Sequence, residues 1–404
     1  MSNKWVAKIL FFVFFVCSSF GYAATHSATG TANSDKPPIK IGMTVPLTGE
    51  LQSLGEGEQI GIQVFFDKIN NAGGINGRKL ELITLDDAYD PLLAAKNVHQ
   101  LIEKEKVFAF MGNMGSAPAI VTLPIINDKK IILFAPITGN NLYRKSPPDP
   151  NIFNFRASLD EETKALVDGV LSIGIKPDEI AFFTQQDSFG QNVYQGAMKA
   201  LKAAGYEHPE NLPYATFVRG TLNVEDALAR IIRYAKISPQ AFILGGNYTT
   251  NSKFIKLAKR EYPHAIFLSV SGRIASADFN KEDAKNVITV ELSPNIDSTL
   301  PAILEYRSDL RKYGKGAQPN ATSLEGYLSA KLFVNALLKA AEKNNLTTDG
   351  VIEALESMKA VDIGIGLDVS FDKNNHQALH TVWPVLLSDG KFIPLKWTDL
   401  QKKQ

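Results

Sequence analysis

Small and hydroxyl-bearing residues follow two apolar runs of the chain, and these residue types could hold an anion. The run VFAFM (107–111) precedes a stretch with Ser116, and IILFA (131–135) precedes one with Thr138 and Gly139. Glycine lets a ligand approach the backbone, and hydroxyls donate hydrogen bonds to carboxylates. A helix that begins near Ser116 would add free N–H groups and a favourable dipole. The two stretches therefore predict a cradle for a small carboxylate.

Taken alone, Ser116 is better explained as a residue that only caps a helix. The similar turn at Thr138 and Gly139 shifts the interpretation toward a ligand site. A phosphate loop is disfavoured, because the sequence contains neither GxxxxGK[ST] nor GxGxxG in the required context.

Two aromatic residues in the second half of the chain come just after predicted strands. Phe189 lies in TQQDSFGQN and Tyr248 in GGNYTTN, and a third turn, SVSGRIAS, holds Ser271 and Arg273. Each aromatic is more simply explained by core packing, but together they indicate a wall that closes over a ligand. Arg273 could be a charge partner, and an exposed loop arginine is an equal alternative.

The residue patterns of common enzymes are missing. The chain has six histidines, none in HExxH spacing, and no GxSxG motif, and its one cysteine, Cys17, lies in the N-terminal segment. We therefore expect no catalytic residues and no cofactor. The aspartates of LDDAYDP (85–91) do not follow EF-hand spacing. We interpret Asp90 as the cap of a helix that begins at Pro91 rather than as a metal ligand.

Strand and helix patterns alternate in two blocks, which predicts an α/β fold with parallel sheets and helices on both faces. The first block starts at residue 39, and the second runs from about 160 to 292. Ligands of such sheets gather at the carboxyl ends of the strands, where the stretches described above lie. Helical segments at 300–313, 322–343 and 348–358, followed by strand-like pieces, are too few for a third domain. They would return to complete two lobes, with three chain crossings as a hinge.

The N-terminal segment has the three parts of a secretory signal. Lys4 and Lys8 precede an apolar stretch (9–16), and small residues follow it. We predict a signal peptide over 1–23 and a flexible leader over 24–38. A membrane anchor is the alternative, but the apolar stretch is short for a helix of about 20 residues. The net charge of +1 gives no electrostatic case for nucleic acid.

Several motifs resemble the type I periplasmic binding proteins of the leucine/isoleucine/valine-binding kind. These are PLTG (46–49), INNAGGINGR (69–78), DDAYDP (86–91), DSFGQN (187–192) and SLEGYLSAKLFVNAL (323–337). The resemblance covers residues 39 to about 390. It implies two Rossmann-like lobes that close on a ligand in the cleft between them. It also implies a monomeric, non-enzymatic protein of the periplasm that serves the permease of an ABC importer.

The resemblance divides the chain into lobe 1 (39–159 and 295–377) and lobe 2 (160–294 and 378–404). It also implies roles for individual residues, carried over by position. Ser116 and the Thr138–Gly139 turn match contacts to the ligand carboxylate. Leu54 falls at a lining position that is often aromatic, and Phe189 and Tyr248 match the wall of the second lobe.

The family's acid for the ligand ammonium should fall near Ser271, where this sequence has none. An amino acid held by another group, an amine-free carboxylate and an amide all stay open as ligands. A sensor subunit for a membrane receptor is the alternative function.

Overall fold

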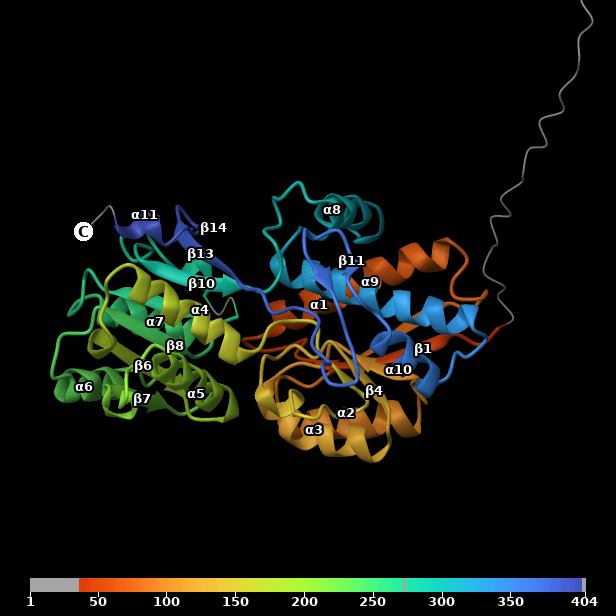
Figure 1. The fold of residues 1–404 in the computed structure, drawn as a ribbon, viewed down its shortest axis with the longest axis horizontal. Helices are drawn as coiled ribbons and strands as arrows, with labels where there is room; N and C mark the ends of the chain where they lie inside the picture. The colour runs from red at the N-terminus through yellow and green to blue at the C-terminus, as the bar shows by residue number, and fades with distance from the viewer. Residues whose placement is uncertain (1–35, 272–273, 402–404) are drawn as a thin grey trace, which may run out of the picture.

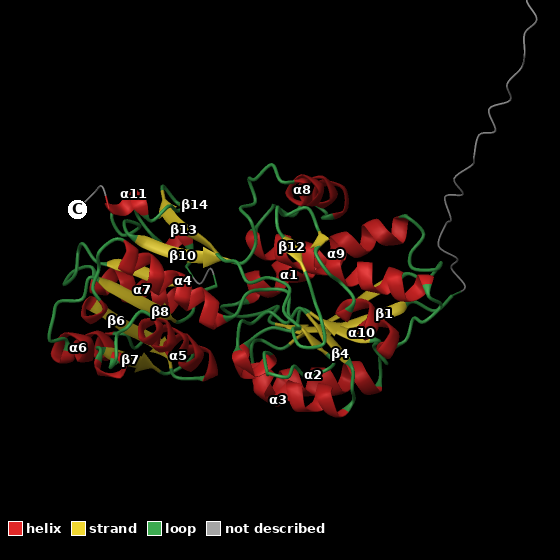
Figure 2. Ribbon diagram, viewed as in Figure 1, coloured by secondary structure: helices red, strands yellow, loops and turns green. Residues whose placement is uncertain are grey.

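Two α/β lobes lie side by side in the computed structural model, which describes residues 36–271 and 274–401 (Figure 1). The predicted signal peptide, most of the leader and Arg273 lie outside these residues. Figure 2 shows that each lobe has strands at its centre and helices around them. Among the residues described, no helix is both long and apolar enough to cross a membrane.

The first lobe is built on a parallel sheet of five strands in the order β2-β1-β3-β4-β5. Its strands are β1 (Ile39–Val45), β2 (Leu80–Asp86), β3 (Ala109–Met111), β4 (Ile132–Phe134) and β5 (Ile152–Phe153). Its helices are α1 (Gln52–Asn71), α2 (Pro91–Glu103), α3 (Ser116–Asp128), α8 (Pro301–Tyr313), α9 (Ala321–Glu342) and α10 (Thr348–Glu356), with a small hairpin of β11 (Val361–Asp362) and β12 (Asp368–Val369).

Helices cover both faces of this sheet because its strands are apolar on both sides. On one face, α2 and α3 pack over Phe110 and Leu133. On the other face, α1, α8, α9 and α10 form the largest core cluster, in which Phe65 and Phe66 of α1 are buried. The helices that return after residue 300 thus complete the first lobe.

The second lobe holds a sheet of seven strands in the order β14-β13-β10-β9-β8-β6-β7, in which β13 and β14 are antiparallel to their neighbours. Its strands are β6 (Ile180–Gln185), β7 (Tyr214–Phe217), β8 (Ala241–Gly245), β9 (Ile266–Ser269), β10 (Val287–Glu291), β13 (Trp383–Ser388) and β14 (Lys391–Pro394). Its helices are α4 (Leu159–Ser172), α5 (Ser188–Ala203), α6 (Glu225–Tyr234), α7 (Tyr248–Ala258) and α11 (Thr398–Gln401).

Alternate residues of strand β6, which lies next to the edge strand β7, face opposite helix layers. Ile180 and Phe182 join the cluster under α4 and α5, whereas Ala181 and Phe183 join the cluster under α6 and α7. This period of two is the direct result of side chains pointing to alternate faces of a strand.

Local signals set the helix ends near the cleft. The Asp90 side chain accepts hydrogen bonds from the N–H groups of Leu92 and Leu93, which confirms it as the cap of α2. Ser158 and Glu161 form a capping box at the start of α4.

The chain passes between the two lobes at three places in the described residues. These are 154–158 between β5 and α4, 292–300 between β10 and α8, and 378–382 before β13. Two of the crossings run side by side, since the Asn154 N–H donates to the His376 carbonyl and the Leu379 N–H donates to the Phe155 carbonyl. The crossings place the carboxyl ends of both sheets around one central cleft.

Candidate ligand-binding cleft

A cavity of about 190 Å³ lies between the two lobes. Residues of both lobes line it. From the first lobe these are Leu54, Ile137, Arg156, Ala321, Thr322 and Glu325, and from the second Tyr248, Ser271, Thr289, Val290, Glu291, Leu292, Ser293 and Phe392. A ligand in this cavity would touch both lobes at once.

Three of the residues predicted from sequence line this cavity. Leu54 comes from the first turn of α1, Tyr248 begins α7, and Ser271 follows β9 with a left-handed φ of 51°. Leu54 and Tyr248 belong to different lobes, so the structure brings an aliphatic and an aromatic wall to the same space.

Ser116 and Thr138 meet, as the carboxylate cradle requires, but do not line the cavity. Their hydroxyl oxygens are 2.8 Å apart, and both side chains are buried. The N-cap of α3 is Gly115, and Ser116 is the first helical residue. The Ser116 hydroxyl therefore hydrogen-bonds with Thr138 and does not cap the helix. Ile137, next to Thr138, does line the cavity, which leaves the pair directly behind its wall.

Gly139 is used for close packing between the lobes. Its carbonyl accepts a hydrogen bond of 2.8 Å from the Leu159 N–H, at the start of α4. A Cβ at Gly139 would lie 2.6 Å from that same nitrogen. Any larger residue would push α4 away from the first lobe.

Phe189 lies in the core of the second lobe and not at the cavity wall. Its side chain is 4% exposed and belongs to the cluster under α4 and α5. The reason is the start of α5, where Asp187 accepts from the N–H groups of Phe189 and Gly190 and fixes the first turn.

A buried ion pair that the sequence analysis missed forms one end of the cavity. Arg156, in the first crossing, donates two hydrogen bonds of 2.7 Å to the carboxylate of Glu325 on α9. Both side chains are 7% exposed. Fork-to-fork pairing of this kind is the strongest geometry available to a guanidinium.

A second acid lies behind this pair. Glu58 of α1 is fully buried, and neither carboxylate oxygen has a partner in the described structure. Burial and repulsion from Glu325 raise its pKa well above the usual value, although Arg156 opposes them. Burial therefore favours the protonated, uncharged form of Glu58.

An acid from a different element contacts Ser271. Glu162 of α4 accepts hydrogen bonds from the Ser271 N–H at 2.6 Å and from its hydroxyl at 2.8 Å. Glu162 is fully buried. Burial raises its pKa to about 7, against the attraction of Arg156 and the bonds from Ser271.

Glu291 is a further acid of the cavity wall. It is the last residue of β10 and is partly buried. Burial raises its pKa to about 7, and the nearby charge of Asp297 acts in the same direction.

The lobes also touch beside the cavity. The Thr249 N–H donates to the Glu50 carboxylate at 3.0 Å, and the Asn141 N–H donates to the Asn192 side chain at 2.9 Å. The Arg219 guanidinium lies 6.0 Å from the centre of the Tyr89 ring. The described conformation is therefore one in which the lobes are in contact across the cleft.

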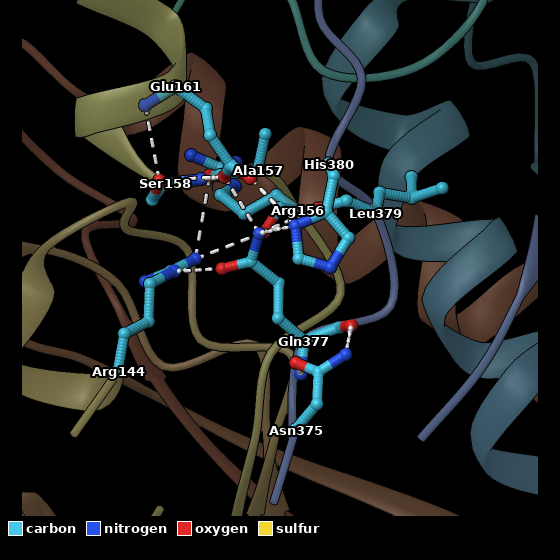
Figure 3. A network of polar contacts seen from close by, with 9 residues as sticks. All are labelled: Arg144, Arg156, Ala157, Ser158, Glu161, Asn375, Gln377, Leu379 and His380. Atoms are coloured by element: carbon cyan, nitrogen blue, oxygen red, sulfur yellow. Dashed lines mark hydrogen bonds and ion pairs between the residues drawn. The ribbon is translucent and has the colours of Figure 1, made fainter. Parts of the chain in front are cut away.

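A polar network joins the crossings behind the cleft (Figure 3). Gln377 is at its centre: its amide oxygen accepts from Arg144 at 2.7 Å, and its nitrogen donates to Glu161 at 2.7 Å. His380 lies 2.7 Å from the other oxygen of Glu161. Figure 3 shows these side chains pointing toward one another from separate elements.

No group of three or more His, Cys, Asp or Glu side chains suited to a metal occurs in the described part of the chain. In DDAYDP, the Asp86 carboxylate accepts from the Leu47 N–H, and Asp87 accepts from the Thr44 hydroxyl. These acids thus hold the loop after β1 to the end of β2.

Comparison with known proteins agrees with this architecture. A family model described as periplasmic binding protein matches residues 38–391. A Leu/Ile/Val-binding protein homolog 7 from Brucella abortus is 23% identical over 388 residues, which cover 92% of this chain and 94% of that protein. The chain therefore belongs to the periplasmic binding protein family.

Solved structures show the same fold. The crystal structure of a possible leucine/isoleucine/valine-binding protein from Rhodopirellula baltica SH 1 has a TM-score of 0.83 and 33% identity, covering 92% of this chain and 99% of that one. A branched chain amino acid ABC transporter structure from Thermus thermophilus with bound valine has a TM-score of 0.74 at 18% identity, covering 89% and 96%. The fold is thus that of a type I periplasmic binding protein, as the sequence motifs predicted, and the chain is a solute-binding protein.

Proposed function

We propose that this protein captures an amino acid or a related small carboxylate between its lobes and delivers it to the permease of an ABC importer. The observation that carries the proposal is the cavity between the lobes, because residues of both lobes line it. A ligand that contacts both lobes binds the closed form better than the open form and shifts the equilibrium toward closure.

The comparisons support this class of ligand. Relatives are named amino acid binding protein and Leu/Ile/Val-binding protein homolog, and one protein of the same fold holds valine. The proposal places the protein in the periplasm as a monomer that performs no catalysis. Its lobes are proposed to divide as 39–159 with 295–377, and 160–294 with 378–404.

Six sequence-predicted residues keep proposed roles in this scheme. Leu54 and Tyr248 enclose the ligand from opposite lobes, and Ser271 contacts it from the end of β9. The Ser116–Thr138 pair would receive the carboxylate through local movement of the adjoining wall at Ile137. Gly139 acts indirectly, by letting α4 approach the first lobe.

The test is a thermal-shift screen of mature protein that has been stripped of ligand by unfolding and refolding. The panel holds the standard amino acids and their deaminated carboxylic analogues. A ligand at 100 times its dissociation constant stabilises the folded state by about 2.7 kcal/mol. Small-angle scattering of the same samples should show compaction on binding.

Leu54→Trp, which fills the cavity, should abolish the shift. Ile232→Trp is the matched control, since Ile232 is 45% exposed on α6 and lies outside the cavity lining. Stabilisation that persists in Leu54→Trp would place the ligand elsewhere, and steady turnover of a ligand would contradict the absence of catalysis.

A further inference from the structure

The cleft proposed above as the binding site has one wall with an unpaired acid, Glu291, and this suggests the chemistry of its ligand. Resting on that proposed function, we infer that the ligand carries an ammonium or other cationic group and that Glu291 receives this group.

Glu291 has no counter-charge of its own. Its side chain forms no hydrogen bond or ion pair with any residue in the described part of the chain, although it lines the cavity. The charged group that acts on Glu291 is Asp297, whose negative charge repels the carboxylate of Glu291. A carboxylate that is partly removed from water and left unpaired costs stability unless a partner arrives.

The neighbouring strand places a second acid behind the same wall. In the parallel pair β9–β10, Ser269 faces Thr289 at the end of the ladder. Ser271 comes two residues after β9, and Glu291 is the last residue of β10. Both residues line the cavity. Glu162, held by the N–H and hydroxyl of Ser271, lies directly behind them.

The positive charge at the other end of the cavity is already neutralised. Arg156 lines the cavity, but its guanidinium is held by both oxygens of Glu325. The described lining thus contains one cation and two acids, Glu325 and Glu291. An amine-free carboxylate would face a surplus of acid, whereas a ligand with an ammonium group would complete the pairing of Glu291.

Because Glu291 is unpaired in the empty cleft, ligand affinity should depend on pH. In the empty cleft the pKa of Glu291 is raised to about 7, so part of the population is protonated at neutral pH. A bound ammonium favours the carboxylate, so Glu291 releases a proton when the ligand binds. Affinity for cationic ligands should therefore rise from pH 6 to pH 8. Glu162 also has a pKa raised to about 7, but Ser271 already occupies its oxygens.

The experiment compares ligands that differ only in the amine. The pairs are L-leucine with 4-methylpentanoate, L-phenylalanine with 3-phenylpropionate, and 4-aminobutyrate with butyrate, titrated by calorimetry at pH 6, 7 and 8. We expect the wild type to prefer the amine-bearing member. Glu291→Gln should weaken that member by about 10- to 100-fold, the range of a hydrogen bond to a charged group, and should change the deaminated member much less.

Proton release on binding can be measured, and it would not be expected if Glu291 had a purely structural role. Titration at pH 7 in phosphate and in Tris should give different heats for the wild type and equal heats for Glu291→Gln. Asp297→Asn removes the repulsion on Glu291 and should move the pH dependence of affinity to lower pH. Glu103→Gln is the control, because its side chain is 65% exposed on α2.

The outcomes separate this inference from the proposed function. If only deaminated ligands bind and Leu54→Trp blocks them, capture in the cleft stands and the cationic ligand is overturned. If an amine-bearing ligand binds but Glu291→Gln keeps the preference, the assignment of Glu291 is overturned. If no member binds in a way that Leu54→Trp blocks, the proposed function itself fails. If Glu291→Gln does not fold, Asp297→Asn provides the test: a pH dependence of affinity that does not move to lower pH would overturn the assignment of Glu291.

Discussion

Two polar regions lie near the hinge, and they differ in how completely their groups are paired. In the network behind the hinge, Arg144 donates to Gln377 and to backbone carbonyls, and Glu161 accepts from Gln377, Ser158 and His380. In the cleft, Glu58 has no partner for either oxygen, and Glu291 has none in the described chain. Buried polar groups are normally satisfied, and a fully paired network rigidifies its surroundings.

This difference in pairing indicates which of the two regions is structural. A network whose members satisfy one another needs no ligand, and it ties the crossings together. A site whose acids stay unpaired costs stability, and the cost is explained if another molecule completes it.

The largest effect is expected for Arg156→Ala. The substitution leaves Glu325 buried without its cation, and breaking a buried ion pair costs about 3–5 kcal/mol. Urea unfolding at pH 7 measures the loss. Lys343→Ala breaks an exposed pair with Glu353 and should leave stability unchanged. If the two variants are equally stable, Arg156 does not hold the cleft together.

Glu58→Gln is expected to have a smaller effect on stability, and this effect should depend on pH. Because burial and Glu325 raise the pKa of Glu58, the folded state binds a proton that the unfolded state releases above about pH 4.5. Wild-type stability should therefore fall as the pH rises from that point toward the folded pKa. An amide removes this dependence, so Glu58→Gln should gain stability over the wild type as the pH rises.

Denaturation curves at pH 5, 7 and 9 would show this gain. Glu105→Gln is the control, since that side chain is 35% exposed in a pair with Lys40. A loss of stability in Glu58→Gln that is equal at every pH would instead mean that Glu58 is ionised and held by Arg156.

The sequence predicted the layers of the fold because strand and helix patterns depend on residues that are close together in the chain. Alternating strands and helices gave both sheets, and α8, α9 and α10 begin and end within two residues of the predicted bounds. Tyr248 and the turn that holds Ser271 were singled out because they follow the ends of strands, where ligands of parallel sheets gather. Leu54 and the role of Ser271 were instead predicted from the family resemblance.

The acids of the cleft could not be predicted in the same way. Arg156 and Glu325 are far apart in sequence, and only the return of α9 to the first lobe joins them. Glu162 looked like an ordinary acid in the first turn of a helix, and it meets Ser271 through packing between α4 and β9. The one local signal was Glu325 itself, because it is the only charged residue in the run SLEGYLS of α9, all of which is buried.

Ser116→Ala tests whether the pair behind the cavity wall belongs to the site. If the ligand carboxylate reaches the Ser116 hydroxyl, affinity should fall about tenfold, the value of one hydrogen bond to a charged group. Thr122→Val is the matched control, because Thr122 lies on the same helix and its hydroxyl donates to the Pro118 carbonyl and not to the Ser116–Thr138 pair. Unchanged affinity in Ser116→Ala, with stability lost in both variants, would make Ser116 a packing residue.

The smallest effect is expected in the hinge, for His380→Gln. The hydrogen bond to Glu161 raises the pKa of His380, so its contribution is complete below about pH 6.5 and is lost as the pH rises through the folded value. Although burial opposes it, the bonds from His380, Ser158 and Gln377 lower the pKa of Glu161 to about 2. The contribution of Glu161 is therefore present above about pH 4.5 and is lost only toward pH 2.

The His380–Glu161 pair is consequently strongest between about pH 4.5 and 6.5. His380 is 57% exposed, and solvent screening limits the effect to about 0.5 kcal/mol. Urea unfolding at pH 5.5 and 8.5 should show a fall in wild-type stability that His380→Gln lacks, and His208→Gln, an exposed contact with Glu210, serves as the control. Equal pH dependence in wild type and His380→Gln would mean that Gln377 and Ser158 hold Glu161 at the hinge without His380.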